Sequence, residues 1–482
     1  MFVGTGSDVG KSVIAAAFCR IFKQDGYQPA PFKAQNMSLN SYATPEGLEI
    51  GRAQAVQAEA AGVPCHTDMN PILLKPQSDH TSQVVLNGRP AGNQSAGSYF
   101  RREGREALRR EVCAAFDRLS QRYNPIVMEG AGSISELNLR DVDIVNMPMA
   151  LHAGAVVVLV ADIDRGGVFA SVYGSIMLLT EEERRHVKGI IINKFRGDLS
   201  LFDRGRAILE ELCHVPVLGV VPYFTDIHIE EEDSMSLAGK SLAAGQSAMA
   251  TRISVAVVLL RHMSNFTDFD VLECDPRVHL YYTNNVKDLD EADVIILPGS
   301  KSTIDDLYHL RRSGIAEAVI RAHRRGATVL GICGGYQMMG REVLDPDHVE
   351  GSTERMPGLG LLPVTTTMSG EKQTRQVTCE YGQGYEIHMG ATLPLEAPSP
   401  LLHLDDGRDD GYRVDDKCMG TYVHGILDNQ PFIDYLLQPY AERLKEAPSF
   451  DYQAYKQQQY DLLADHVRRY VDVQAVYRFL CG

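Results

Sequence analysis

The stretch from Gly4 to Ser12, which reads GTGSDVGKS, limits what this chain can fold into more than any other feature. Its last three residues have the pattern of a phosphate-binding loop, in which backbone N–H groups hold phosphates, lysine reaches the β- and γ-phosphates and the hydroxyl binds Mg²⁺. The first glycine of the usual pattern is Thr5 here, and a glycine stands one residue earlier. We predict that nucleotide phosphates are bound by Gly4, Thr5, Gly10, Lys11 and Ser12.

The residues around this loop have the strand–loop–helix order that such a site requires. Phe2 and Val3 can end a strand, and apolar residues recur with helical spacing from Ile14 to Phe22. A helix that begins directly after the loop places bound phosphates at its N-terminus. Because the strand is so short, the sequence leaves open a true start upstream of Met1.

Length, charge and cysteine usage narrow the class of protein. A chain of 482 residues is expected to form two or three domains, at ~100–200 residues each. The formal net charge of -16 argues against binding to bulk nucleic acid or to anionic membranes. There is no signal-peptide pattern and no apolar run of ~20 residues, as a membrane span would need. The cysteines lack C-x-x-C and zinc spacings, which predicts a cytoplasmic protein; the oligomeric state is not indicated.

Four apolar runs in the first half predict a parallel sheet that is covered by helices on both faces. They lie at residues 126–128, 155–161, 189–192 and 217–221, and each ends in polar or glycine residues. Continuous apolar strands between helices are typical of doubly wound sheets, whose ligands bind beyond the carboxyl ends of the strands. We therefore predict an α/β P-loop domain over residues 1–235.

The second half repeats an α/β pattern. Residues 236–251 are rich in alanine, glycine and serine, which predicts a linker. Strands are then expected at 253–260, 294–297 and 328–332, and helical sequence runs to the C-terminus. The second domain is predicted to span residues 252–482.

Two polar residues at predicted strand ends suit a bound nucleotide. Glu129 can bind Mg²⁺ together with Ser12, since Mg²⁺ prefers oxygen ligands; a helix-capping or salt-bridged carboxylate is the alternative. Asn193 ends the third apolar run and can hydrogen-bond a nucleotide base. A guanine-reading N-K-x-D motif would need an acid at the position of Arg196, so ATP is predicted rather than GTP.

A cysteine between glycines marks a second candidate site. Cys333 follows an apolar run at a sharp strand-to-helix turn, where glycines permit close packing and a strained backbone. A helix N-terminus favours the thiolate form of a cysteine. The N–H groups of Gly299 and Gly334 can bind an oxyanion, and His424 can act as the base. The sequence therefore predicts nucleophilic catalysis by Cys333.

This pattern resembles the elbow of the class I, or triad, glutamine amidotransferases. Their elbow reads G-x-C-x-G-x-Q, which is matched by Gly331, Cys333, Gly335 and Gln337. The resemblance implies a flavodoxin-like second domain, glutamine as the ammonia donor and a glutamine site that includes Gln337. In that family a glutamate commonly follows the histidine by two residues, but Ile426 stands there in this chain. Glu386 is a candidate to orient His424 instead.

The first half resembles the dethiobiotin-synthetase-like P-loop proteins. They share the loop at Gly4–Ser12 and the E-G-A-G sequence at Glu129–Gly132. The two halves together are similar to the amidases of cobalamin biosynthesis. Four longer segments resemble the cobyric acid synthases among them: residues 33–41, 69–76, 161–169 and 264–269.

Resemblance to the cobyric acid synthases implies a reaction. It is the ATP-dependent, glutamine-hydrolysing amidation of the b, d, e and g carboxylates of adenosylcobyrinic acid a,c-diamide, through an acyl phosphate and a glutamyl thioester. Cobalt belongs to the corrinoid substrate, so no protein-bound transition metal is expected. A cobyrinic acid a,c-diamide synthase, a cell-wall amidase and a ParA-like P-loop ATPase remain as alternatives. The corrinoid is expected to contact Lys33, Gln35, Asn36, Lys75 and Arg165, although a solvated loop is the other interpretation of residues 33–41.

Overall fold

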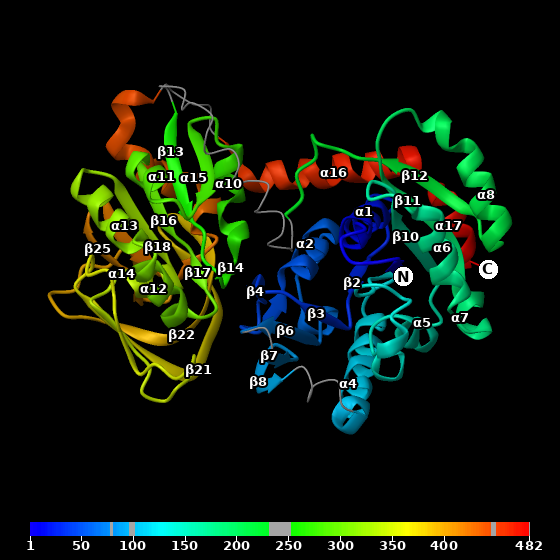
Figure 1. The fold of residues 1–482 in the computed structure, drawn as a ribbon, viewed down its shortest axis with the longest axis horizontal. Coiled ribbons are helices and arrows are strands. Elements are labelled where there is room, and N and C mark those ends of the chain that lie inside the picture. Colours follow the sequence, from blue (N-terminus) through cyan, green and yellow to red (C-terminus); the bar gives the residue numbers. More distant parts are fainter. Residues whose placement is uncertain (78–80, 96–101, 231–251, 445–449, 482) are drawn as a thin grey trace. The chain divides into compact units, whose positions relative to one another are not determined.

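The computed structural model describes residues 1–77, 81–95, 102–230, 252–444 and 450–481 (Figure 1). The chain divides into two compact units. The first comprises residues 1–37, 50–229 and 454–482, and the second comprises 38–49 and 230–453. The units are not continuous in sequence: segment 38–49 belongs to the second unit, and segment 454–482 belongs to the first. The predicted linker lies outside the described residues, and no described helix is long and apolar enough to span a membrane.

A parallel sheet forms the centre of the first unit. Its order is β1 (Phe2–Gly4), β10 (Val157–Asp162), β11 (Val187–Phe195) and β12 (Val217–Pro222), and all pairs are parallel. β2 (Ala30–Phe32) and β9 (Ile126–Met128) form a parallel pair, and a parallel bridge joins Phe2 to Glu129 after β9. The predicted parallel sheet of the P-loop half is therefore confirmed.

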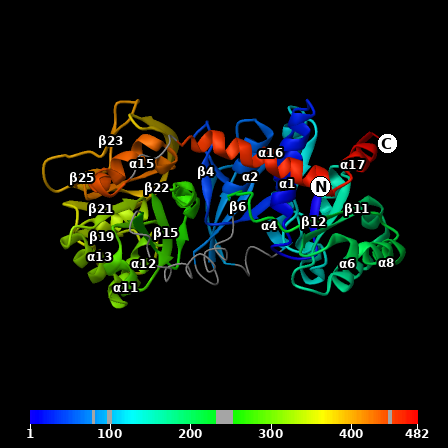
Figure 2. The ribbon, with the colours of Figure 1, turned by 90° about the horizontal axis from the view of Figure 1, so that it is seen from above.

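Helices pack on this sheet and bury its apolar residues. The helices of the first half are α1 (Lys11–Gln24), α2 (Arg52–Ala61), α4 (Arg102–Ser120), α5 (Met147–His152), α6 (Val168–Met177), α7 (Glu181–His186) and α8 (Asp203–Cys213). α16 (Tyr452–Tyr470), from Ala454 on, and α17 (Val473–Cys481) join them from the end of the chain. Figure 2 shows α16 beside α1, where Arg20 pairs with Asp461 at 2.6 Å. Ile14 and Phe18 share one core with Leu463.

A smaller mixed sheet completes the first unit. Its order is β3 (Gln35–Met37), β6 (Ile72–Pro76), β7 (Thr81–Leu86) and β8 (Arg89–Ser95). β3 and β6 are parallel, and the other two pairs are antiparallel. β3 begins only two residues after β2 ends, so the first strand of this smaller sheet lies near the carboxyl end of β2.

The main sheet of the second unit is also largely parallel. Its order is β15 (Val278–Thr283), β13 (Ile253–Val258), β16 (Val294–Leu297), β18 (Thr328–Ile332), β26 (Cys418–Thr421) and β25 (Tyr412–Asp415). Only β25 is antiparallel to its neighbour. The accompanying helices are α10 (Asp270–Cys274), α11 (Val286–Glu291), α12 (Thr303–Arg312), α13 (Ile315–Arg324), α14 (Gly334–Met339) and α15 (Gln430–Leu437). The predicted α/β class of this half is confirmed.

A second sheet of this unit runs past the end of β18. Its order is β20 (Arg355–Pro357), β19 (Glu342–Leu344), β21 (Val364–Cys379), β22 (Gly382–Pro394) and β27 (Val423–His424). β14 (Met263–Ser264) pairs with β17 (Gly299–Ser300), and β23 (Leu402–His403) pairs with β24 (Asp409–Asp410). β4 (Ser41–Ala43) pairs with β5 (Glu49–Gly51), and β4 contacts β21 and β22.

Candidate active sites

The phosphate loop joins β1 to α1, as predicted, and its glycines have steric causes. Gly10 has a φ of 95°, and a Cβ there would lie 2.2 Å from Nδ2 of Asn193. A Cβ on Gly4 would lie 2.8 Å from the carbonyl oxygen of Gly6. Neither position can carry a side chain unless its neighbours move, so the conformation of the loop requires glycine at both positions.

Lys11, Ser12 and Glu129 meet at the start of α1. The Lys11 ammonium donates to the carbonyl oxygens of Gly6 at 2.8 Å and Gly132 at 3.1 Å. The Ser12 hydroxyl donates to Oε1 of Glu129 at 2.7 Å. Lys33 Nζ also lies 3.1 Å from Oε1 of Glu129, and the Gln57 amide donates to Oε2 at 2.9 Å.

This environment keeps Glu129 ionised although it is buried. Burial alone would raise the pKa of the carboxyl, but the charge of Lys33 and the hydrogen bonds from Ser12 and Gln57 lower the pKa below its ordinary value. A hydroxyl and an ionised carboxylate in contact are an oxygen donor set that suits Mg²⁺. The residues present therefore fit the predicted magnesium site.

Asn193 lies at the loop and contacts its backbone. Its amide nitrogen donates to the carbonyl oxygen of Val9 at 2.9 Å, and the residue is buried. Its assignment to the nucleotide base stays a prediction. Arg196 lies three residues on, pairs with Asp164 at 2.8 Å and covers the ring of Tyr223 at 3.9 Å. No acid therefore occupies the position that a guanine-reading motif requires.

The five residues expected at the corrinoid lie in three places of the first unit. Lys33 is at Glu129, next to the phosphate loop. Gln35 and Asn36 are buried in β3, and Lys75 is buried in the neighbouring strand β6. Arg165 is exposed in the loop after β10, with one nitrogen 3.5 Å from Oδ2 of Asp8. Four of the five therefore lie on the run from Lys33 to β6, and Arg165 approaches the phosphate loop from another strand.

Cys333 occupies the sharp turn between β18 and α14 that the sequence predicted. Its φ of 52° and ψ of -109° are a strained backbone conformation. A Cβ on Gly335 would lie 1.9 Å from the carbonyl oxygen of Leu297, and one on Gly331 would lie 2.6 Å from Sδ of Met339. The glycines thus allow the turn to pack against β16 and α14, which holds the thiol at the end of β18.

His424 has an acidic partner that the sequence analysis did not identify. Its Nδ1 lies 2.7 Å from Oδ2 of Asp268, and the Gly425 N–H donates to Oδ1 of Asp268 at 3.1 Å. Asp268 is buried in the short 3₁₀ helix Phe266–Phe269. It thus takes the position of a third triad member, next to the histidine in space and 156 residues away in sequence.

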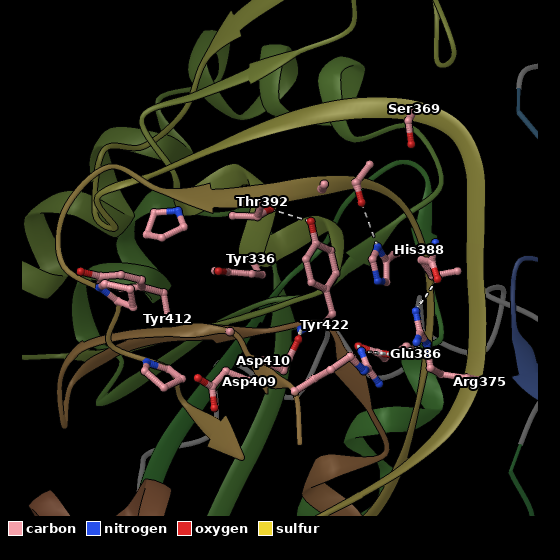
Figure 3. Close-up of a pocket in the computed structure, with 18 of the residues that line it drawn as sticks. Tyr336, Ser369, Arg375, Glu386, His388, Thr392, Asp409, Asp410, Tyr412 and Tyr422 are labelled. Atoms are coloured by element: carbon pink, nitrogen blue, oxygen red, sulfur yellow. Dashed lines mark hydrogen bonds and ion pairs between the residues drawn. The ribbon is translucent and has the colours of Figure 1, made fainter. Parts of the chain in front are cut away.

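The assignment of Glu386 as the orienting group is wrong. Glu386 pairs with Arg375 at 2.8 Å and with Arg408 at 3.2 Å. Glu386, Arg375 and Arg408 line a cavity of about 460 Å³. Figure 3 shows Glu386 and Arg375 there, together with Tyr422 and His388. The register explains the error: Tyr385 lies opposite His424, and Glu386 lies opposite Val423. Successive side chains of a strand point to opposite faces, so Tyr385 stacks on the imidazole and Glu386 faces away.

The charge of His424 follows from its neighbours. Burial would lower the pKa of the imidazole, but the carboxylate of Asp268 and the side chain of Cys333 raise it to about 10. A side-chain hydrogen bond to Cys333 contributes to this shift. At neutral pH the imidazole therefore carries a proton that it can pass to a leaving amine.

The remaining predicted residues lie close to the cysteine turn. A Cβ on Gly299 would lie 3.2 Å from Cε1 of His424, and one on Gly334 would lie 2.8 Å from the backbone nitrogen of Ser300. Gly299 and Gly334 therefore both lie where β17 meets the start of α14. Gln337 is buried, accepts from the Thr303 hydroxyl at 3.1 Å and donates to the Met389 carbonyl oxygen at 2.9 Å.

Asp268→Asn is expected to lower glutamine hydrolysis by roughly 10²–10⁴-fold, because the variant loses the group that orients and charges the imidazole. Without the carboxylate the pKa of His424 falls, so the alkaline limb of kcat/KM against pH moves to lower pH. Glutamate release measured from pH 6 to 11 checks both effects. An unchanged alkaline limb would contradict a role for Asp268 in setting the charge of His424.

Two family models cover most of the chain. The CobQ/CobB/MinD/ParA nucleotide binding domain matches residues 1–237, and the CobB/CobQ-like glutamine amidotransferase domain matches residues 254–432. Both models agree with the order of the two predicted sites. The combination does not favour a ParA-like ATPase, which would need no amidotransferase half.

Curated relatives match over their full length. A cobyric acid synthase from Bacteroides fragilis is 72% identical, over 100% of this chain and 98% of the relative. One from Phocaeicola vulgatus is 68% identical, and one from Syntrophobacter fumaroxidans is 48% identical, with the same coverage of both chains. Neither an a,c-diamide synthase nor a cell-wall amidase is favoured by these matches. The chain belongs to the cobyric acid synthase family of glutamine amidotransferases.

Proposed function

We propose that the protein uses ATP and glutamine to amidate the b, d, e and g carboxylates of adenosylcobyrinic acid a,c-diamide, giving cobyric acid. The observation that carries this proposal is the full-length match to cobyric acid synthases of a chain that holds both a phosphate loop and a Cys333–His424–Asp268 group. Each group suits one half of the reaction.

Cys333 and His424 are proposed to release ammonia from glutamine. The Cys333 thiolate attacks the carboxamide carbon, and the N–H groups of Gly299 and Gly334 stabilise the resulting oxyanion. The C–N bond then breaks as the His424 imidazolium gives its proton to the leaving nitrogen, which leaves a thioester. Water then attacks the thioester carbon and gives one proton to His424, which restores the imidazolium. The C–S bond breaks, the thiolate is restored, and the acid that leaves ionises to glutamate. Gln337 is proposed to help form the glutamine site, where it accepts a hydrogen bond from Thr303.

The phosphate loop is proposed to activate the carboxylate. A corrinoid carboxylate oxygen attacks the γ-phosphorus of ATP, ADP leaves, and ammonia then displaces phosphate from the acyl phosphate. Activation is needed because oxide is a poor leaving group and phosphate is a good one. Gly4, Thr5, Gly10 and Lys11 hold the phosphates, and Lys11 neutralises charge on the transferred group. Mg²⁺ held by Ser12 and Glu129 would supply further neutralisation of phosphate charge.

The corrinoid is proposed to lie against Lys33, Gln35, Asn36, Lys75 and Arg165. This proposal is supported by the position of Lys33 at Glu129 and by the neighbouring positions of β3 and β6. The cationic and amide groups suit a substrate with several carboxylate and amide arms. Cobalt is part of the corrinoid substrate, so the proposed reaction needs no transition metal bound by the protein.

A mass-resolved assay tests the proposed reaction. Purified protein is incubated with ATP, Mg²⁺, glutamine and either adenosylcobyrinic acid or its a,c-diamide, and the amides added are counted by mass. We expect four additions to the a,c-diamide, with ATP hydrolysis stimulated by that corrinoid. Two additions to adenosylcobyrinic acid with none to its a,c-diamide would instead identify a cobyrinic acid a,c-diamide synthase.

ATP is expected to be preferred over GTP by ~10-fold or more in kcat/KM, because a buried base edge left without its partner costs ~1–3 kcal/mol. Asn193 is proposed to contact adenine, and Arg196 leaves no acid to read guanine. Amidation rates at several concentrations of each nucleotide give the ratio. Equal kcat/KM values would remove Asn193 from base recognition and leave the family assignment untouched.

A further inference from the structure

Residues 38–49 of the N-terminal half belong to the second unit. They follow β3 and precede α2, both of the first unit, yet they pack on the strands that carry the amidotransferase site. The nucleotide-binding model covers these residues, and the amidotransferase model begins only at residue 254. The segment is therefore part of the second unit, although it lies outside the residues that match the amidotransferase model.

The C-terminal part of this segment is held on β21. Glu49 forms an ion pair with Lys372 of β21, and the two side chains are 0% and 6% exposed. The Gln376 amide donates to the carbonyl oxygen of Ala43 at 3.0 Å. A buried ion pair resists separation, because either charge alone would lie in an apolar environment. These two contacts thus hold the segment in a fixed position on β21.

The N-terminal part of this segment holds the turn that carries Asp268. Oδ1 of Asn40 accepts from the Phe266 N–H at 3.2 Å, and the Ser41 N–H donates to Oδ1 of Asn265 at 2.9 Å. Asn265 has a φ of 53° and begins the 3₁₀ helix in which Asp268 lies. Both bonds are buried, so they fix the backbone at the point from which Asp268 reaches His424.

The same segment also supports His424 from the other side. The ring of Tyr42 lies 4.6 Å from the ring of Tyr385. Tyr385 in turn stacks on the imidazole of His424, with ring centres 5.3 Å apart and planes 20° apart. Tyr42, Ala43, Tyr385 and Ile387 form one apolar cluster, and the carbonyl oxygen of Ile387 accepts from the Cys333 thiol at 3.5 Å.

We propose that residues 38–43 position the Asp268–His424 pair, so that glutamine hydrolysis depends on a segment from the synthetase half of the chain. Asn40 and Ser41 hold the turn of Asp268, and Tyr42 holds Tyr385 against the imidazole. These are positioning residues, since none of them touches the reacting atoms. This inference rests on the proposed glutaminase role of Cys333 and His424.

The test compares variants of the full-length protein. Asn40→Ala removes the acceptor for Phe266, and Tyr42→Ala removes the ring that packs on Tyr385. Tyr42→Phe keeps that ring. Thr44→Ala is the matched control: the Thr44 hydroxyl accepts from the Leu48 N–H at 3.3 Å within the segment itself, and this bond does not involve the turn of Asp268. Melting temperatures identify any variant that is broadly destabilised.

We expect Asn40→Ala and Tyr42→Ala to lower kcat for glutamine hydrolysis by roughly 10–100-fold, as a misplacement of about 1 Å can do, with a smaller change in KM. The alkaline limb of the pH profile should move to lower pH, as in Asp268→Asn. The rate at which iodoacetamide alkylates Cys333 at pH 7, followed by peptide mass, should fall in the same two variants, and this measurement needs no turnover. Tyr42→Phe and Thr44→Ala should behave as the parent protein, and amidation with ammonium chloride should stay within about 2-fold.

Two other results would overturn the positioning role, and a third would refute the proposed function. Parent-like kcat, pH limb and alkylation in both alanine variants would overturn the positioning role. Equal losses with glutamine and with ammonia, in proportion to the fall in melting temperature, would overturn it too, because they indicate general destabilisation. A parent protein that releases no glutamate from glutamine would instead refute the proposed function itself.

Discussion

Replacing Cys333 by alanine is expected to reduce glutamine-dependent amidation to the background of the assay. The variant loses the thiol that is proposed to form the thioester, and the alanine methyl group that replaces it is no nucleophile. Amidation with ammonium salts should persist at a pH high enough to supply free NH₃, since Lys11, Ser12 and Glu129 lie in the other unit. Counting the amides added by mass, with each nitrogen source, measures both effects.

Cys418 provides a matched control for this substitution. It is also a buried cysteine of the second unit, and its thiol lies 3.6 Å from the carbonyl oxygen of Leu361, as that of Cys333 lies near Ile387. Burial raises the pKa of the Cys418 thiol to about 12, so it stays protonated at neutral pH and is no nucleophile. Cys418→Ala should keep glutamine-dependent activity. Full glutamine-dependent activity in Cys333→Ala would refute the amidotransferase assignment, and loss of the ammonia reaction would indicate a structural role.

Local patterns in the sequence predicted the sheets and the two loops well. The apolar runs before Glu129, Asp162 and Asn193 became parallel strands, because an apolar strand between helices has few other ways to bury both faces. The strand–loop–helix order fixed the phosphate loop and the cysteine turn, since each depends on contiguous residues. The motif predicts a glycine at position 10, and the close approach of Asn193 gives the physical reason for it.

These local patterns could not predict contacts between segments that are distant in the sequence. Asp268 reaches His424 because the 3₁₀ helix that follows β14 lies next to β27 and Gly425, and a single sequence does not show which segments pack together in this way. Segment 264–269 resembles the cobyric acid synthases, and this resemblance is a signal in the sequence that points to a role for its acid. Glu386 failed as a candidate for the same reason, since its face of β22 depends on the pairing with β27.

The placement of residues 38–49 was equally hidden. Their amides and hydroxyls suggested a polar ligand, but Asn40 and Ser41 pair with Phe266 and Asn265 in the interior. A buried amide needs a partner whether that partner is a ligand or the backbone, so composition alone does not distinguish the two.

Replacing Lys11 by methionine is expected to abolish amidation with either nitrogen source, which separates it from Cys333→Ala. Methionine keeps most of the length of the side chain and removes its charge. The loss should be ~10²–10³-fold or more, because Lys11 is proposed to neutralise charge on the transferred phosphoryl group. Glutamate release from glutamine should continue, since Cys333, His424 and Asp268 lie in the second unit.

Lys188 is the matched control for the change of charge, because it is exposed at the start of β11. Lys188→Met should therefore leave both activities as they are. Product counts by mass and glutamate release, measured on the same preparations, separate the two halves of the reaction. The hydrogen bonds from Lys11 to Gly6 and Gly132 also shape the loop, so nucleotide binding by Lys11→Met should be measured alongside. Near-normal amidation by Lys11→Met would remove the phosphate loop from the mechanism, because no other part of the reaction needs a cation at that position.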